Sequence, residues 1–156
     1  MRRKEREVTD QNIIDEIIRA CDICHLGLND NGRVYIVPLN FGFLNENGKR
    51  VLYFHSAKEG KKIDLIKENG YAGFQMNTGY ELVSGEKACD YTAKFRSVAG
   101  GGKISVVQSE EEKMSGLRAV MNSTAGEKNW QYNEKWLNAV CIIKLEIGEI
   151  SCKENI

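Results

Sequence analysis

Short apolar segments separated by turn residues make up most of the chain, and few of them have the spacing of a helix. Extended apolar segments lie at 25–28, 34–43, 51–55, 71–76, 93–107 and 139–150. Clusters of Asn, Asp and Gly at 29–32 and 45–48 are typical of tight turns between antiparallel strands. The polar segment 78–90 is predicted to be a connection. Three adjacent glycines at 100–102 predict a bulge or bend in the strand that contains them.

Helical spacing is confined to a few segments. Helices are predicted at about 10–21, 58–68 and 109–122, with a helical turn at 133–137. Thr9-Asp10 and Ser109 are expected to cap two of them. Because strands outnumber helices and short turns join most strands, we predict a mainly β fold, an antiparallel barrel with peripheral helices. The length of 156 residues, without repeats or linkers, predicts a single domain spanning 1–156.

Charge balance and cysteine content disfavour several functional classes. Lys plus Arg number 22, as do Asp plus Glu, so no net field attracts nucleic acid or anionic membranes. No apolar run reaches the ~20 residues of a membrane span, and no apolar segment follows the basic N-terminus as in a signal peptide. Five cysteines without framework spacing are typical of free thiols. We therefore expect a cytoplasmic protein with neither a nucleic-acid nor a membrane partner.

The segment 58–68 has an unusual order of charges for a helix. Lys58, Lys61 and Lys62 crowd its first turns, whereas Glu68 lies at its end. A helix N-terminus carries a partial positive charge and prefers acidic side chains. Lysines are favourable there if an anion also binds, held by backbone N–H groups and ammonium charges together. The order predicts a phosphate site, with a solvated helix face as the alternative.

Several segments also resemble a family of flavin proteins. They are VPLNFG (37–42), LYFHSAKEGKKIDLI (52–66), ELVSGEKACDYT (81–92), FRSVAGGGK (95–103) and the opening RRKEREVTD (2–10). Together they cover nearly the whole chain, and LYFHSAKEGKKID is the most specific part. The chain resembles the 5-nitroimidazole antibiotic resistance (nitroimidazole reductase) family, flavin-binding split barrels related to pyridoxamine 5'-phosphate oxidase. The resemblance implies an FMN-binding split β-barrel of antiparallel strands.

The resemblance places the flavin phosphate at the second helix. Lys61 and Lys62 take the place of adjacent basic residues, and as lysines they would bind by point charge rather than by a bidentate fork. Ser56 would contact the phosphate or the ribityl chain through its hydroxyl. His55 would lie beside the ring, where its candidate catalytic role is proton donation to substrate. A polar residue that merely ends a strand is the alternative for His55.

Two further strands supply the remaining implied contacts. Val37, Pro38, Leu39 and Asn40 would run along the isoalloxazine ring, with Asn40 where the family carries a lysine. Pro38 is the only proline, and within a strand it predicts an edge, a bulge or a strand start. Arg96 and Ser97 are further candidate cofactor-binding residues, and by the resemblance Ser97 would approach the flavin from a second subunit. The alternative for Arg96 is a surface arginine on an alternating strand.

Other motifs in the chain lack the context that their chemistry needs. Cys21–His25 spells C-x-x-C-H, but there is no export signal for haem attachment and no second cysteine pair for zinc. The run Gly100–Lys103 is not a phosphate-binding Walker loop, because Ile104 replaces the required Ser or Thr. No G-x-S-x-G is present, and two histidines offer little for a hydrolytic triad. We expect no metal site.

The main functional prediction is an FMN-binding oxidoreductase that reduces nitro or similar electrophilic small molecules by two electrons. FAD is possible in place of FMN, and NAD(P)H is the expected electron donor. Because the flavin carries the hydride chemistry, the protein needs few acid–base groups. The alternatives are a pyridoxamine 5'-phosphate oxidase-like enzyme and a non-catalytic flavin or haem-binding protein. The first is less favoured, because residues 153–156 hold no arginine-rich segment for a substrate phosphate.

We also expect a homodimer with the flavin at its interface. An incomplete barrel wall leaves apolar surface and strand edges that need covering. Phe41, Phe43, Phe95, Val98 and Trp130 are more apolar material than one thin barrel with short helices is expected to hide. A two-fold interface uses the same patch twice, so the dimer would carry two equivalent flavin sites.

Overall fold

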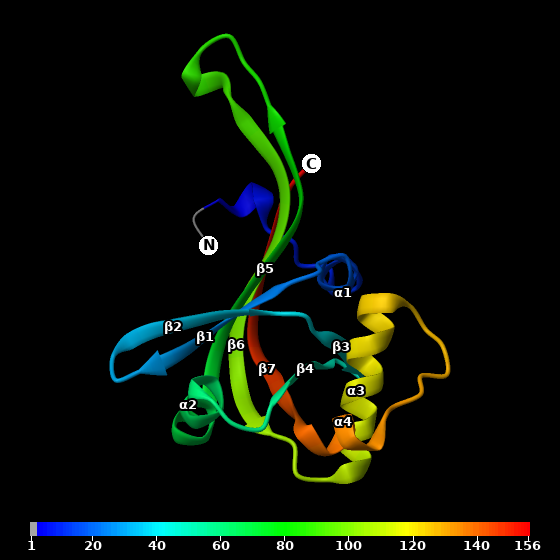
Figure 1. Ribbon diagram of the computed structural model, residues 1–156. Coiled ribbons are helices and arrows are strands. Elements are labelled where there is room, and N and C mark those ends of the chain that lie inside the picture. Colours follow the sequence, from blue (N-terminus) through cyan, green and yellow to red (C-terminus); the bar gives the residue numbers. More distant parts are fainter. Residues whose placement is uncertain (1–2) are drawn as a thin grey trace.

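The computed structural model describes residues 3–156 and is built around one seven-stranded antiparallel sheet (Figure 1). The strands are β1 (Cys24–Asp30), β2 (Arg33–Leu39), β3 (Gly42–Glu46), β4 (Lys49–Ala57), β5 (Tyr71–Val83), β6 (Thr92–Val106) and β7 (Val140–Asn155). The α-helices are α1 (Gln11–Arg19), α2 (Lys61–Asn69), α3 (Glu110–Ala125) and α4 (Glu134–Ala139), and short 3-10 helices lie at Lys4–Arg6 and Ala88–Asp90. The mainly β fold with peripheral helices is as predicted.

The order of the strands shows how the sheet is rolled. That order is β2-β1-β5-β6-β7-β4-β3, so the consecutive strands β2 and β3 lie at opposite edges of the sheet. Only Asn40 and Phe41 join them, and the three virtual bonds from Leu39 to Gly42 span at most about 11 Å. The two edges are therefore brought together, and the sheet closes into a barrel with a split between β2 and β3.

The prediction of one extended segment at 34–43 was wrong, because the chain leaves the sheet at Asn40. The side-chain amide of Asn40 donates to the backbone oxygen of Asp22 at 3.1 Å, which fixes the exit from β2. Gly42 then begins β3 against α3, where a Cβ atom would collide with the backbone at Ala119 and Val120. A hydrophobicity pattern does not reveal this break, because apolar residues continue on both sides of it.

The prediction that 78–90 is a connection was also wrong. β5 continues to Val83 and pairs with β6 as far as Thr92, after a register shift between Thr78 and Glu81. Residues 79–95 form a two-stranded projection, which we call the arm, that leaves the barrel at the top of Figure 1. Both faces of the arm are open, so its side chains lack the apolar and polar alternation of a half-buried strand.

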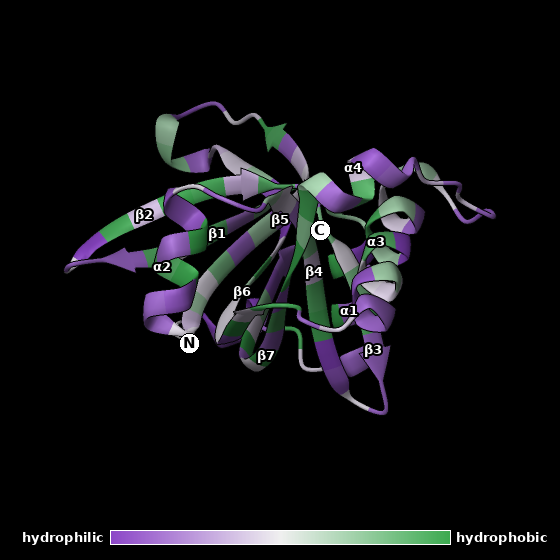
Figure 2. Cartoon of the chain, turned by 60° about the horizontal axis from the view of Figure 1, so that its bottom comes forward, coloured by the Kyte–Doolittle hydropathy of each residue, from purple (hydrophilic) through white to green (hydrophobic). Residues whose placement is uncertain are grey.

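Two hydrophobic clusters hold the molecule together. The larger fills the barrel, where α1 and α2 contribute buried isoleucines to the side chains of the inner faces of the strands. The smaller lies outside the barrel wall, where α3 packs on Tyr53 and Ile142 beside β4 (Figure 2). A buried ion pair joins α1 to β4, since Arg50 Nε lies 2.6 Å from Asp15 Oδ1.

The expectation of exposed phenylalanines was wrong. Phe41, Phe43 and Val98 are buried in the main cluster, because the barrel wall closes over them. Phe95 is half-buried below the guanidinium of Arg6, and the half-buried Trp130 donates from Nε1 to Asn122 Oδ1 at 3.0 Å. The large apolar side chains that are exposed in the described part of the chain are other ones. Among residues 3–156 we find no helix with the length and apolar character of a membrane span.

Candidate functional site

The end of β4 carries a buried hydroxyl without a partner. Ser56 follows Leu52 and Phe54 on the inner face of the strand and is 6% exposed. Its Oγ has no hydrogen-bond partner within residues 3–156. A buried hydroxyl left unpaired costs about 1–3 kcal/mol, so Ser56 has an unused capacity to bind a ligand. His55 lies on the opposite, exposed face of the same strand end.

Helix α2 begins close after this strand, and no side chain caps its N-terminus. It starts at Lys61 rather than at the predicted Lys58, with Gly60 as the N-cap at a φ of 128°. Glycine is needed there, because other residues rarely adopt this conformation. The first turn therefore presents backbone N–H groups together with Lys61 and Lys62, a suitable arrangement for an anion.

The two lysines at the start of α2 have different surroundings. Lys61 Nζ lies 2.6 Å from Asp30 Oδ2 at the end of β1 and 5.0 Å from the ring centre of Tyr35 on β2. The hydrogen bond to Asp30 raises the pKa of Lys61. No such carboxylate pairs with Lys62 among the described residues. The charge of Lys61 is therefore committed to the β1–β2 hairpin, whereas Lys62 keeps its charge for a ligand.

A basic cavity of about 270 Å³ lies beside the same strand end. Lys58, Lys67 and Lys113 line it together with Cys141, which pairs with Ser56 across β4 and β7. Burial raises the pKa of the Cys141 thiol, and the charges of Lys113, Lys62, Lys58 and Lys67 oppose that rise. The sequence did not single out Lys67 and Lys113, because only the packing of α2 and α3 brings them to this place.

The strand predicted to lie along a flavin ring is an edge strand. β2 pairs only with β1, and Pro38 lies opposite His25, so the prediction of an edge position for the proline is confirmed. Val37 and Leu39 are half-buried and share a face with Tyr35, over which Lys61 lies. The start of α2 is therefore adjacent to the inner face of β2. The Asn40 amide is already engaged with Asp22.

Arg96 and Ser97 lie far from this group of residues. They belong to β6 at the base of the arm, where Arg96 Nε is 3.4 Å from Glu154 Oε2 and Ser97 pairs with Lys153. Between the partners of Ser56 and Ser97, β7 runs from Cys141 to Lys153, which is ~40 Å of extended strand at about 3.3 Å per residue. A single chain does not bring Ser97 to the anion-binding end of the barrel.

The C-x-x-C-H segment shows no reactive thiol. Burial raises the pKa of Cys21 to about 11 and that of Cys24 to about 12, so both remain protonated near neutral pH. Within residues 3–156 no group of three or more His, Cys, Asp or Glu side chains is placed to hold a metal ion.

Comparison with known proteins agrees with this arrangement of strands. A family model described as pyridoxamine 5'-phosphate oxidase matches residues 10–154. Comparison with curated proteins gives no significant match. Among solved structures, a candidate 5-nitroimidazole antibiotic resistance protein from Bacteroides thetaiotaomicron superimposes with a TM-score of 0.81 at 28% identity, over 95% of this chain and 86% of that one.

Two more distant structures share the fold. The flavocytochrome Anf3 from Azotobacter vinelandii gives a TM-score of 0.81 at 23% identity, over 100% of this chain and 72% of that one. An FAD and heme binding protein from Mycobacterium smegmatis gives a TM-score of 0.82 at 17% identity, over 96% of this chain and 73% of that one. The antiparallel fold of this chain is therefore the split barrel of flavin-binding proteins.

Proposed function

The chain belongs to the pyridoxamine 5'-phosphate oxidase family, and we propose that it is an FMN-dependent reductase of nitro or similarly electrophilic small molecules. One observation carries the proposal: the unpartnered, buried Oγ of Ser56 lies on the strand that leads directly to the uncapped start of α2. The nitro substrate is suggested by the 28% identical structure, whose description is antibiotic resistance towards 5-nitroimidazoles.

The residues present fit the phosphate of a flavin. Ser56 Oγ would donate a hydrogen bond to a phosphate oxygen, and Lys62 would supply a positive charge beside it. Lys58, just before the helix, adds to the positive potential. Lys61 would act mainly by positioning, since its bond to Asp30 ties the start of α2 to the β1–β2 hairpin.

A bound flavin would supply hydride transfer, for which the side chains of this chain offer no group. Val37, Pro38 and Leu39 would run along the ring, and Pro38 would leave the edge of the sheet open at that point. His55 lies on the opposite, exposed face of β4 from Ser56, so it does not share the proposed phosphate site, and proton donation to substrate is its proposed role. NAD(P)H is the proposed electron donor. FAD is the alternative cofactor, because the structurally similar protein from Mycobacterium smegmatis binds FAD and heme.

We further propose a homodimer in which each flavin site is completed by the second subunit. The separation of Ser97 from Ser56 within one chain supports this arrangement, because a ligand at α2 is out of reach of the Ser97 of the same chain. A second copy related by a two-fold axis could bring its own Arg96 and Ser97 to the site.

The cofactor proposal is tested by titrating the protein with FMN and following fluorescence. Ser56→Ala and Lys62→Ala should each raise the Kd for FMN by about ten- to a hundredfold, because each removes a hydrogen bond or charge on the phosphate. Lys61→Ala should have a smaller effect. Lys49→Ala, at the other end of β4, is the matched control and should leave the Kd unchanged. Equal affinities in all four variants would refute the site.

The activity is tested by bleaching the bound flavin with NADH or NADPH and then adding a nitroimidazole. Reoxidation of the flavin with loss of nitro absorbance, under argon, is the expected result. A flavin that no donor reduces would favour the non-catalytic flavin or haem-binding alternative.

Oxidation of pyridoxamine 5'-phosphate is the second candidate, favoured by the basic cavity of Lys58, Lys67 and Lys113, which could accept a substrate phosphate. Pyridoxal phosphate formation with oxygen uptake distinguishes it from nitro reduction.

A further inference from the structure

A cavity of about 380 Å³ lies beside the split between the edge strands β2 and β3. The end of α1, the start of β3 and the end of α3 meet around it, and Figure 1 shows the last turn of α3 beside α1. We call it the seam cavity. The residues that line it include Arg19, Phe41, Phe43, Asn122, Ser123 and Glu127.

Arg19 lies over an aromatic wall of the seam cavity. Its guanidinium carbon is 5.0 Å from the centre of the Phe43 ring, and Phe41 and Phe43 are almost completely buried. A guanidinium that lies over a ring keeps its planar fork of N–H groups available to an acceptor. Within residues 3–156 Arg19 forms no ion pair, and the arginine side chain that donates hydrogen bonds is that of Arg50. All five N–H donors of Arg19 are therefore unused.

The side-chain amide of Asn122 adds a donor whose orientation is fixed by Trp130. An indole Nε1 only donates, so the amide atom 3.0 Å from it is the oxygen Oδ1. The NH₂ group of Asn122 is then on the other side of the amide. It has no acceptor in the described part of the chain, where the asparagine amides that donate are others. The Ser123 hydroxyl is a further donor in the lining.

The charges of the lining cancel, which restricts the ligand that fits. Arg19 supplies one positive charge and Glu127 one negative charge, and the two do not form an ion pair. A ligand that matches the unused donors carries oxygen acceptors, whereas a full negative charge would be repelled by Glu127. A nitro group has two oxygens in one plane and no net charge, so it matches the planar fork of Arg19. Phe41 and Phe43 match a flat aromatic ring that carries this group.

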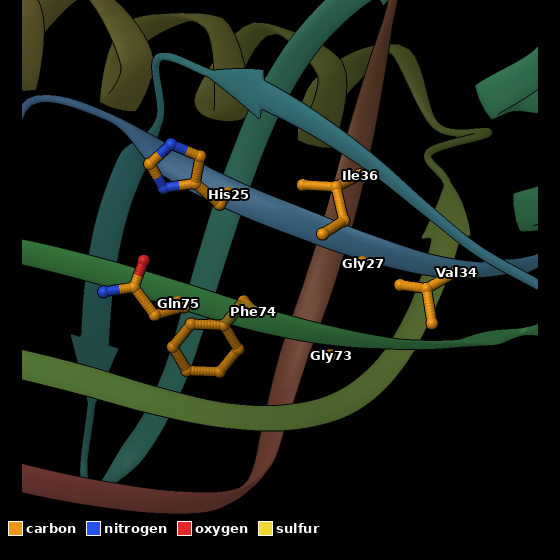
Figure 3. Close-up of a pocket in the computed structure, with 7 residues that line it drawn as sticks. All are labelled: His25, Gly27, Val34, Ile36, Gly73, Phe74 and Gln75. Carbon is orange, nitrogen blue, oxygen red and sulfur yellow. The ribbon is translucent and has the colours of Figure 1, made fainter.

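The groove on the outer face of β1, β2 and β5 has a similar volume but lacks this chemistry. Its volume is about 370 Å³, and Val34 and Ile36 lie along one side, with His25 and Gln75 at one end (Figure 3). No arginine, lysine or carboxylate lines it. The seam cavity is therefore the better site for a polar aromatic compound.

The seam cavity also adjoins the strand assigned to the flavin ring. Lys61 at the start of α2 lies over Tyr35, and Leu39 follows four residues later on β2, which is ~13 Å of extended strand. After Leu39 and Asn40 the chain reaches Phe41, which lines the cavity. A flavin whose phosphate is held at α2 and whose ring runs along β2 would therefore extend towards this cavity.

We propose that the seam cavity is the substrate subsite and binds a planar, nitro-substituted heteroaromatic ring. Arg19 and Asn122 donate hydrogen bonds to the nitro oxygens, and Phe41 and Phe43 contact the ring. This subsite rests on the proposed function, whose substrate it places, and it identifies Arg19 as the main substrate-binding side chain.

Trp130 provides a readout that needs no flavin, because it contacts Asn122. The chain has two tryptophans, so Trp136→Phe leaves Trp130 as the single one. Titration of this flavin-free full chain with 1,2-dimethyl-5-nitroimidazole should quench the tryptophan fluorescence with saturation, after correction for absorbance of the probe. Arg19→Ala should raise the Kd at least about tenfold, because charge-assisted hydrogen bonds are lost. Arg19→Lys, which keeps the charge but not the fork, should lie between. Arg33→Ala at the β1–β2 turn is the matched control and should leave the Kd unchanged.

Linear, collisional quenching that is equal in all of these variants would overturn the proposal. Kinetics of the FMN-loaded protein then separate the subsite from the proposed function. Arg19→Ala should raise the KM for the same nitro compound at least about tenfold, with the Kd for FMN and the rate of flavin bleaching unchanged. A chain that takes up no FMN but shows quenching dependent on Arg19 refutes the cofactor and supports the subsite. Turnover of the nitro compound with an unchanged KM in Arg19→Ala supports the function and refutes the subsite.

Discussion

The glycines of β6 differ from those of β1 and β5 in whether the packing of the chain requires them. At Gly100 and Gly102 a Cβ atom would collide with the backbone oxygens of Glu149 and Glu146 on β7, so the close approach of β6 and β7 requires glycine. At Gly27 and Gly73 a methyl group would fit. The packing of the chain therefore requires glycine in one region and does not require it in the other.

The largest expected effect concerns the internally constrained pair. Gly100→Ala and Gly102→Ala should each lower the free energy of unfolding by about 3 kcal/mol or more, because rigid backbone must shift to accept the methyl group. Urea denaturation followed by circular dichroism measures this. A loss below about 1 kcal/mol would show that β7 can move away.

Gly27→Ala and Gly73→Ala should have little effect on the free energy of unfolding. The free energy of unfolding of the monomer should change by no more than about 1 kcal/mol and could rise, since alanine restricts the unfolded chain. Urea denaturation measures this as well, and a loss of more than about 2 kcal/mol would contradict the space found at these two positions.

Helix α3 covers the outer wall of the barrel beside β4. There Glu112 Oε1 accepts from Lys144 Nζ at 2.6 Å and from the Tyr53 hydroxyl at 3.1 Å. The bond from Lys144 lowers the pKa of Glu112 below its ordinary value of 4.5, burial opposes this, and the bond from Tyr53 adds to it.

Because the folded pKa of Glu112 is depressed, its stabilisation is present above about pH 4.5 and is lost as the pH falls through the folded value. Glu112→Gln should therefore cost at most about 1 kcal/mol at pH 7, since the pair is partly exposed, and the difference from wild type should vanish towards pH 3. Urea midpoints across this range measure it. A difference that persists at pH 3 would indicate a packing effect rather than a charge effect.

The smallest expected effect is seen by chemical labelling of thiols in the unmutated protein. The label shows which cysteine side chains are accessible to solvent. Cys89 at the tip of the arm is exposed, whereas the other four cysteines are buried. Burial raises the pKa of Cys152 to about 11 and that of Cys24 to about 12. Maleimide at pH 7 should add one label per native chain and five after unfolding, as intact mass shows. More than one label on the native protein would contradict the closed barrel.

Local chemistry predicted much of the fold. The Asn31–Gly32 turn, with positive φ at both residues, joins β1 to β2 as the sequence indicated. Asp10 and Ser109 cap their helices through hydrogen bonds to backbone N–H groups. The break at Asn40 and the length of the arm were not predictable, because both depend on which strand pairs with which, and short-range patterns do not determine that.

The candidate site was predicted in part. Ser56 lies near the end of β4 and Lys61 and Lys62 at the start of α2, as expected from their order in the chain, but the capture of Lys61 by Asp30 depends on a hairpin distant in the sequence. Whether a buried hydroxyl has a hydrogen-bond partner is likewise visible only in three dimensions. The sequence therefore did not show that Ser56 Oγ lacks one. The distance of Ser97 from these residues was hidden for the same reason.

The split between β2 and β3 has a consequence for the order of folding. The hairpins β1–β2, β3–β4 and β5–β6 join neighbours in the sequence, and such hairpins form within about 1–10 μs. Pairing of β4 with β7 instead joins Val51–Ala57 to Val140–Glu146 across a long loop. We therefore expect closure of the barrel to limit refolding to the millisecond-to-second range typical of non-local β topologies. The seam between the edges, bridged only by Asn40 and Phe41, would be the last part of the wall to form.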